Sequence, residues 1–202
     1  MDDGEKPGLP QLVDLLEERD AELNAHGQRV ADHAGAIARE MGLPAPAVAR
    51  IRVAARLHDL GKVWIARDIL DKPGPLNEHE WVEIRRHPRT AATLLQVAEL
   101  HELADIVIAH HERPDGAGYP HGIPSREGPL DAQIVAVADV YDAMRSPRPY
   151  GPTLGPEEAR RELERVSATQ LDANVVEAFL RVLADRRERR GAANAAGGSG
   201  SA

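Results

Sequence analysis

Hydrophobic residues recur every three or four positions along most of this chain, which is the spacing that gives a helix one buried face. Two consecutive stretches, residues 9 to 24 and 26 to 41, follow this spacing, with Leu16 and Val30 among their apolar positions. Gly42 comes next and supplies a stop, because glycine readily adopts the left-handed conformation that ends many helices. We find no convincing strand in the pattern. It therefore predicts an all-α fold.

Local signals mark where the later helices begin and end. Asn77 is a good N-cap, and Glu80 stands three residues later, as in a capping box. Pro156 follows Gly155 at another favourable helix start. With these signals, the apolar spacing predicts helices over residues 44 to 60, 77 to 87, 88 to 97, 101 to 111, 131 to 144, 156 onward and 172 to 190. A long loop rich in glycine and proline is predicted up to about Pro129.

The chain has 202 residues, which is enough for one domain with a substantial core. Residues 1 to 190 are predicted to form that domain. Residues 191 to 202 are predicted to be a disordered tail, because they are almost entirely alanine, glycine and serine.

Composition narrows the classes of protein further. The chain has no cysteine, which excludes disulfides and thiolate metal sites and fits a reducing cytoplasm. No apolar run approaches the ~20 residues of a membrane span, and the acidic N-terminus is not a signal peptide. The net charge of -8 argues against a nucleic-acid polymer as partner. We therefore expect a cytoplasmic protein that does not bind membranes.

Histidines and carboxylates stand at helix ends or within apolar runs. Glu22 and His26 are four residues apart on one predicted helix, so their side chains leave the same face. Asp139 lies in an apolar run, residues 135 to 140, where an unpaired carboxylate would be costly. The other candidate ligands are His58, Asp59, His87, His110 and His111.

Neighbouring helical residues point about 100° apart, so one small ion cannot easily take both members of His58-Asp59 or of His110-His111. Two or three adjacent ions can, with a carboxylate bridging them. Imidazole and carboxylate without sulfur suit iron, manganese or zinc. Such ions would outweigh the three candidate carboxylates, leave a positive centre for phosphate, and generate a nucleophile from water at neutral pH.

Several segments form a recognisable series: residues 57 to 62, 69 to 76, 87 to 88, 110 to 120, 138 to 143 and 148 to 150. The most specific is the stretch from His110 to Pro120, which reads His-His-Glu-Arg-Pro-Asp-Gly-Ala-Gly-Tyr-Pro. The series resembles the HD-GYP group of the HD phosphohydrolase superfamily over about residues 18 to 183. A plain HD domain would lack the Gly-Tyr-Pro stretch.

The resemblance implies an HD-domain helical bundle with two or three divalent metal ions, iron or manganese. By motif match, the metal ligands are Glu22, His26, His58, Asp59, His87, His110, His111 and Asp139. Asp59 and Lys62 are then the catalytic residues, and Lys62 matches a lysine that contacts the scissile phosphate. Tyr119 and Arg148 match residues near a bound dinucleotide.

We therefore expect a bacterial signalling phosphodiesterase that hydrolyses cyclic di-GMP to linear pGpG and, with three ions, onward to GMP. Gly151 stands where the family usually carries a lysine or arginine, so a phosphohydrolase for another cyclic dinucleotide or a nucleotide is an alternative. A second alternative is a metal- and dinucleotide-binding sensor or interaction module with little turnover. A second copy of the chain or a regulatory protein is left open as its protein partner.

Overall fold

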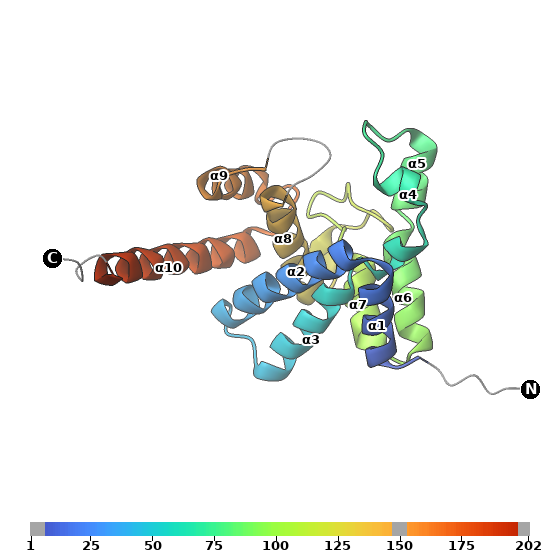
Figure 1. The fold of residues 1–202 in the computed structure, drawn as a ribbon, viewed down its shortest axis with the longest axis horizontal. Helices are drawn as coiled ribbons and strands as arrows, with labels where there is room; N and C mark the ends of the chain where they lie inside the picture. Colours follow the sequence, from blue (N-terminus) through green and yellow to red (C-terminus); the bar gives the residue numbers. More distant parts are fainter. Residues whose placement is uncertain (1–6, 147–152, 198–202) are drawn as a thin grey trace, which may run out of the picture.

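The computed structural model describes residues 7 to 146 and 153 to 197, and it is built from helices (Figure 1). The elements are α1 (Leu9–Arg19), α2 (Ala21–Glu40), α3 (Ala45–Leu57), the 3-10 helix η1 (Leu60–Trp64), α4 (Arg67–Leu70), α5 (Glu78–Ile84), α6 (His87–Val97), α7 (His101–Ala109), the 3-10 helix η2 (Ser125–Glu127), α8 (Leu130–Arg145), α9 (Pro156–Val166) and α10 (Ala173–Gly197). Within these ranges, β-type pairing is limited to an isolated bridge between Ser167 and Leu171. The all-α fold is confirmed.

The core forms around α2, which packs on α3, α8 and α10, while α6 packs on α7 and η1. The core is aliphatic, and Val30 on α2, Ile51 on α3 and Val137 on α8 are all inaccessible to solvent. Phe179, the chain's one phenylalanine, is also fully buried on α10. After Phe179, α10 projects from the body of the molecule on the side opposite α5 (Figure 1). Among the described residues, no helix has the length and apolar character needed to cross a bilayer.

Local signals in the sequence are borne out at several helix ends. The side chain of Asn77 accepts a hydrogen bond from the Glu80 amide at 3.0 Å, and the Glu80 carboxylate accepts one from the Asn77 amide at 2.7 Å. This reciprocal pair is the predicted capping box. Gly42 has the expected positive φ of 75° after α2, and α6 begins at His87, with Pro88 in its first turn.

Several helix boundaries differ from the prediction, and two of them affect the site. The first helical stretch divides at Asp20, whose carboxylate accepts a hydrogen bond from the Leu23 amide at 3.0 Å and so caps α2. The helix predicted to reach residue 60 ends instead at Leu57. The chain then turns into η1, so that His58 and Asp59 lie on a turn.

The glycine at position 61 explains why the chain turns there. A Cβ atom on Gly61 would lie 2.1 Å from the carbonyl oxygen of His87. Only glycine therefore allows the backbone of η1 to approach the start of α6 this closely. The contact brings His87 next to the turn that carries Asp59.

The last helix also differs from the prediction. It was expected to end at Gly191, whereas α10 continues to Gly197. The segment is rich in alanine, the strongest helix former, which offsets the cost of the internal glycine. Residues 198 to 202 lie outside the described part of the chain, and the boundary between domain and tail stays a prediction.

Candidate metal centre

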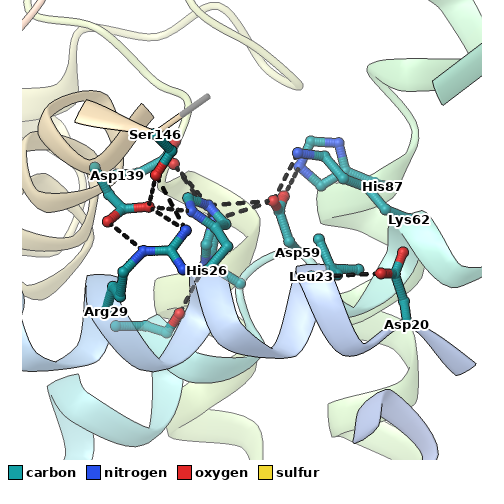
Figure 2. Close-up of polar contacts among 12 residues, drawn as sticks. Asp20, Leu23, His26, Arg29, Asp59, Lys62, His87, Asp139 and Ser146 are labelled. Carbon is teal, nitrogen blue, oxygen red and sulfur yellow. Dashed lines mark hydrogen bonds and ion pairs between the residues drawn. The ribbon is translucent and has the colours of Figure 1, made fainter. Parts of the chain in front are cut away.

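Seven of the predicted metal ligands meet in one cluster, although they come from distant parts of the sequence. The contributing side chains are His26 on α2, His58 and Asp59 after α3, His87 at the start of α6, His110 and His111 after α7, and Asp139 on α8. Figure 2 shows Asp59 between His26 on one side and His87 on the other. Packing of α2, α3, α6, α7 and α8 therefore creates the cluster.

The ligand atoms fall into two groups that share one carboxylate. In each group the ligand atoms lie within 4.8 Å of one another: the first group is His26, His58 and Asp59, and the second is Asp59, His87, His110 and His111. Asp139 adjoins the first group, with a carboxylate oxygen 3.1 Å from His26 Nε2. Asp59 can therefore bridge two ions, as the adjacency of His58 and Asp59 suggested.

The candidate groups place adjacent residues together. One small ion was not expected to take both members of His58-Asp59 or of His110-His111 easily, because helical neighbours diverge by about 100°. Both His58 and Asp59 belong to the first group, and both His110 and His111 belong to the second. The reason is that α3 ends at Leu57 and α7 at Ala109, so each pair lies past the regular helix.

Backbone contacts orient three of the histidines. The Nδ1 atoms of His58, His87 and His110 lie 2.7, 2.7 and 2.6 Å from the carbonyl oxygens of Ala55, Ile84 and Val107. A carbonyl oxygen can only accept a hydrogen bond, so each Nδ1 carries the proton. In its neutral form, a ring held in this way presents the lone pair of Nε2, the arrangement found in metal-ligating histidines.

The inward-facing atoms of these residues lack hydrogen-bond partners. The Nε2 atoms of His58, His87 and His110 and the Oδ1 atom of Asp59 are buried and make no hydrogen bond. Such orphaned polar atoms are costly in a protein interior unless another group completes them. Imidazole nitrogens and a carboxylate oxygen that converge in this way fit a divalent metal ion.

The pKa values of the cluster residues are shifted in different directions. Burial alone would raise the pKa of Asp59, but His58 and Lys62 outweigh it and hold that pKa well below its usual range. Burial opposes a charge on His58 as well, yet Asp59 and Asp139 raise the pKa of His58 to about 10. Burial and the nearby His87 lower the pKa of His111 to about 3. Asp59 and Asp139 therefore stay ionised beside the first group, while His111 in the second group is a neutral imidazole at neutral pH.

A partly buried ion pair behind His26 was not assigned a role from the sequence. The carboxylate of Asp142 on α8 lies 2.8 Å from His26 Nδ1, and it also accepts hydrogen bonds from the Arg29 guanidinium at 2.8 and 3.0 Å. Burial raises the pKa of Asp142, but these two partners outweigh it and lower the pKa far below normal. Asp142 therefore stays ionised and holds His26 with Nε2 facing the cluster. The only signal in the sequence was its spacing, one helical turn after Asp139.

Lys62 lies on η1 at the edge of the cluster. Its Nζ atom is 2.6 Å from Asp59 Oδ2 (Figure 2). The side chain is about one quarter exposed, so its cation borders both the ligand groups and the solvent. The predicted contact with a scissile phosphate stays a prediction.

The Gly-Tyr-Pro loop lies over the second group. The carboxylate of Glu112 accepts hydrogen bonds from the amides of His121, Gly122 and Ile123 at 2.7 to 3.2 Å, which fastens the loop. The ring centroid of Tyr119 is 4.6 Å from that of His111. The loop thus presents Tyr119 as a wall beside the cluster.

Two predicted site residues are not in the cluster that the structure describes. Glu22 is exposed on α2, one turn before His26, and belongs to neither ligand group. Its role as a ligand of a third ion therefore stays a prediction. Arg148 lies outside the described residues, as does Gly151.

A helical bundle that surrounds a buried cluster of histidines and aspartates is the architecture of a candidate metal-binding domain. Residues 10–175 match the family model for the HD domain, and the chain belongs to the HD domain family. Its resemblance to the HD-GYP group is confirmed by relatives that are named cyclic di-GMP phosphodiesterases.

Two of the relatives are named as phosphodiesterases of cyclic dinucleotides. The chain is 42% identical over 181 residues to the "Cyclic di-GMP phosphodiesterase" of Thermotoga maritima, an alignment that covers 85% of this chain and 48% of that protein. It is 35% identical over 177 residues to the "3'3'-cGAMP-specific phosphodiesterase 2" of Vibrio cholerae, covering 84% and 33%. The chain thus spans half or less of the length of these relatives.

A solved structure supports the fold. The HDG"Y"P protein Bd1817 of Bdellovibrio bacteriovorus superposes with a TM-score of 0.67 at 20% identity, over 81% of this chain and 53% of that one. At this identity the likeness concerns the helical architecture alone.

Proposed function

We propose that this chain is a metal-dependent phosphodiesterase that hydrolyses cyclic di-GMP to linear pGpG. The observation that carries the proposal is the shared carboxylate, since Asp59 belongs to both groups of convergent ligand atoms. A pair of adjacent ions is suited to displacement at a phosphorus atom, because one ion stabilises the attacking oxygen and the other the leaving oxygen. The name of the Thermotoga maritima relative supports the choice of substrate.

The residues of the chain have distinct parts in this reaction. Divalent ions held by the histidines and aspartates would supply Lewis-acid stabilisation and a nucleophile from water. Water adds to phosphorus, one ester bond of the cyclic substrate breaks, and the leaving oxygen takes up a proton. Lys62 stabilises the charge that develops on the phosphoryl oxygens. Tyr119 lines the substrate site, and Glu112 keeps its loop in place.

The ions proposed are iron or manganese, because imidazole and carboxylate ligands without sulfur suit both metals. The two ligand groups support two ions. A third ion would need Glu22, and onward cleavage to GMP is proposed only if it binds. Metal analysis of protein purified without oxygen tests the identity and number of the ions.

The experiment that tests the function compares hydrolysis of cyclic di-GMP by metal-loaded wild type with that by His58→Ala and Asp59→Ala. Chromatography of the nucleotide products separates pGpG from GMP. His101→Ala is the matched control, because His101 is exposed at the start of α7. We expect the two cluster variants to lose activity and the control to keep it. Equal turnover in all four proteins would contradict the proposal.

A second candidate substrate is 3'3'-cGAMP or another cyclic dinucleotide. The name of the Vibrio cholerae relative favours it, as does Gly151 in place of the usual cation. A panel of cyclic dinucleotides at equal concentration, compared by kcat/KM, distinguishes the two. Tight binding of metal and dinucleotide with negligible turnover would point instead to a sensor or interaction module.

A further inference from the structure

An open groove of about 420 Å³ adjoins the metal centre. One wall comes from α5 and the start of α6, and the other from the Gly-Tyr-Pro loop. Its lining includes Val82, Arg85, Arg86, Arg89, Tyr119 and Pro120. Three guanidinium groups on one wall are unexpected in a protein whose net charge is -8.

The groove carries a surplus of positive charge. Arg86 is neutralised by Glu83, with Nη1 and Oε1 2.6 Å apart. Arg85 and Arg89 have no carboxylate within ion-pair distance among the described residues, and both are exposed. An arginine fork without a carboxylate partner is ready to take a phosphate in two parallel hydrogen bonds.

The guanidinium groups of Arg85 and Arg89 both contact the Gly-Tyr-Pro loop. The Arg85 guanidinium carbon lies 5.7 Å from the ring centroids of both Trp81 and Tyr119. Arg89 donates a hydrogen bond from Nη2 to the carbonyl oxygen of Pro120 at 3.2 Å. Because these contacts restrict the side chains, less conformational entropy is lost when an anion binds.

The ring of Tyr119 borders both the groove and the metal centre. Tyr119 contacts Arg85 on one side and His111, 4.6 Å away between ring centroids, on the other. A ligand with an anionic group at the metal cluster can therefore extend past Tyr119 towards Arg85. A cyclic dinucleotide has this form, since it carries two phosphates and two bases on one ring.

We propose that Arg85 and Arg89 bind the second phosphate of the cyclic dinucleotide while the first lies at the metal centre. This inference rests on the proposed function, because it assumes a substrate with two phosphates. Exposed Trp81 stacks against Arg85 and supports its guanidinium. The two arginines then determine the preference for cyclic dinucleotides over smaller phosphodiesters.

A comparison of two substrates tests the proposal. Bis(p-nitrophenyl) phosphate has one phosphate and reaches the metal centre without filling the groove. In metal-loaded Arg85→Ala we expect kcat/KM for cyclic di-GMP to fall at least ~10-fold more than kcat/KM for the small diester, mainly through KM, as loss of a charge-assisted hydrogen bond implies. Arg161→Ala, an exposed arginine on α9, is the matched control and should change neither. Equal losses on both substrates, or no loss on either, would overturn the inference.

Binding without turnover separates this inference from the proposed function. Calorimetry measures the affinity of chelator-treated protein for cyclic di-GMP, so the result does not depend on hydrolysis. Weaker binding by Arg85→Ala, with partial recovery in Arg85→Lys, supports the groove even if the loaded enzyme cleaves no cyclic di-GMP. Equal affinity in wild type and Arg85→Ala, or no binding by wild type, overturns it even if hydrolysis is observed.

Discussion

Asp59 is the residue on which both ligand groups depend. It is buried at the turn between α3 and η1, within reach of His58, His87 and Lys62. No other residue belongs to both groups in the part of the chain that the structure describes. A carboxylate suits this position, because its two oxygens could serve two cations at once.

Asp59→Asn should therefore lower the occupancy of both ions, whereas His87→Ala should affect only the second group. We expect metal affinity to fall by about 100-fold or more in Asp59→Asn, since even outer-shell substitutions cost 10–100-fold. Elemental analysis after dialysis at defined free metal concentrations measures this. Two retained ions in Asp59→Asn would contradict a bridging role.

Asp142 orients His26 and is held in turn by Arg29. Asp142→Asn keeps the shape of the side chain but removes the charge, which weakens the hydrogen bond that keeps His26 Nε2 turned towards the cluster. We expect a loss of about 10–100-fold in affinity for one ion. Metal titration measures it.

The matched control for this variant is Asp131→Asn. Asp131 lies on the same helix and binds an arginine, with Oδ2 2.7 Å from Arg50 Nη2, but it does not contact the cluster. Its variant should keep full metal affinity. If both variants lose affinity equally, the effect is general destabilisation of α8 rather than orientation of His26.

At the scale of elements, close backbone contacts set the position of the ligands. Gly61 lets η1 touch the start of α6, and Gly118 allows the loop to fold back, since its Cβ would lie 2.4 Å from the carbonyl oxygen of His111. Both glycines adjoin histidines of the second group. The ligand geometry therefore depends on residues that bear no functional group.

Gly61→Ala should push η1 away from α6 and displace His87. Overpacking of this kind costs about 1–3 kcal/mol, so we expect a lower melting temperature and weaker metal binding together. Calorimetric unfolding and metal titration check the two effects. Gly74→Ala is the control, because a Cβ at Gly74 meets nothing within 4 Å. An unchanged melting temperature in Gly61→Ala would show that the contact can relax.

At the scale of the whole molecule, α10 is attached to the bundle beside His33 on α2. The ring of His33 lies 5.2 Å from that of Tyr141 and 5.5 Å from that of Phe179, between centroids. Burial and the nearby Arg186 lower the pKa of His33 to about 4. This histidine is outside the metal cluster, so its titration reports on the fold.

The folded pKa of His33 lies below the unfolded value of about 6.5, so the unfolded chain binds a proton that the folded chain does not between those values. Stability should therefore fall as the pH is lowered from 6.5 to about 4. The expected contribution is on the order of 1–2 kcal/mol, because the site is partly solvated. Urea unfolding of chelator-treated protein at several pH values measures it.

His33→Gln should reduce this pH dependence, and His101→Gln, at an exposed position, should not. Identical slopes of stability against pH in wild type and His33→Gln would show that His33 does not couple the attachment of α10 to pH.

The sequence alone determined the helices, several of their ends and the chemical types in the candidate metal site. These features are local, since helical periodicity, the Asn77–Glu80 box and the motif around His110 each span a few consecutive residues. Boundaries failed where a side chain or a tertiary contact decided them, as at Asp20 and after Leu57.

Only the tertiary structure decided which candidate ligands lie close enough to share an ion, which residues support them, and which groove lies beside them. Asp142 and Arg29 are 113 residues apart, so no local pattern predicts their ion pair. The groove likewise joins Arg85 to Tyr119 across separate segments. The physical reason is that periodicity fixes the directions of side chains on one helix, whereas distances between helices are set by how their buried faces pack.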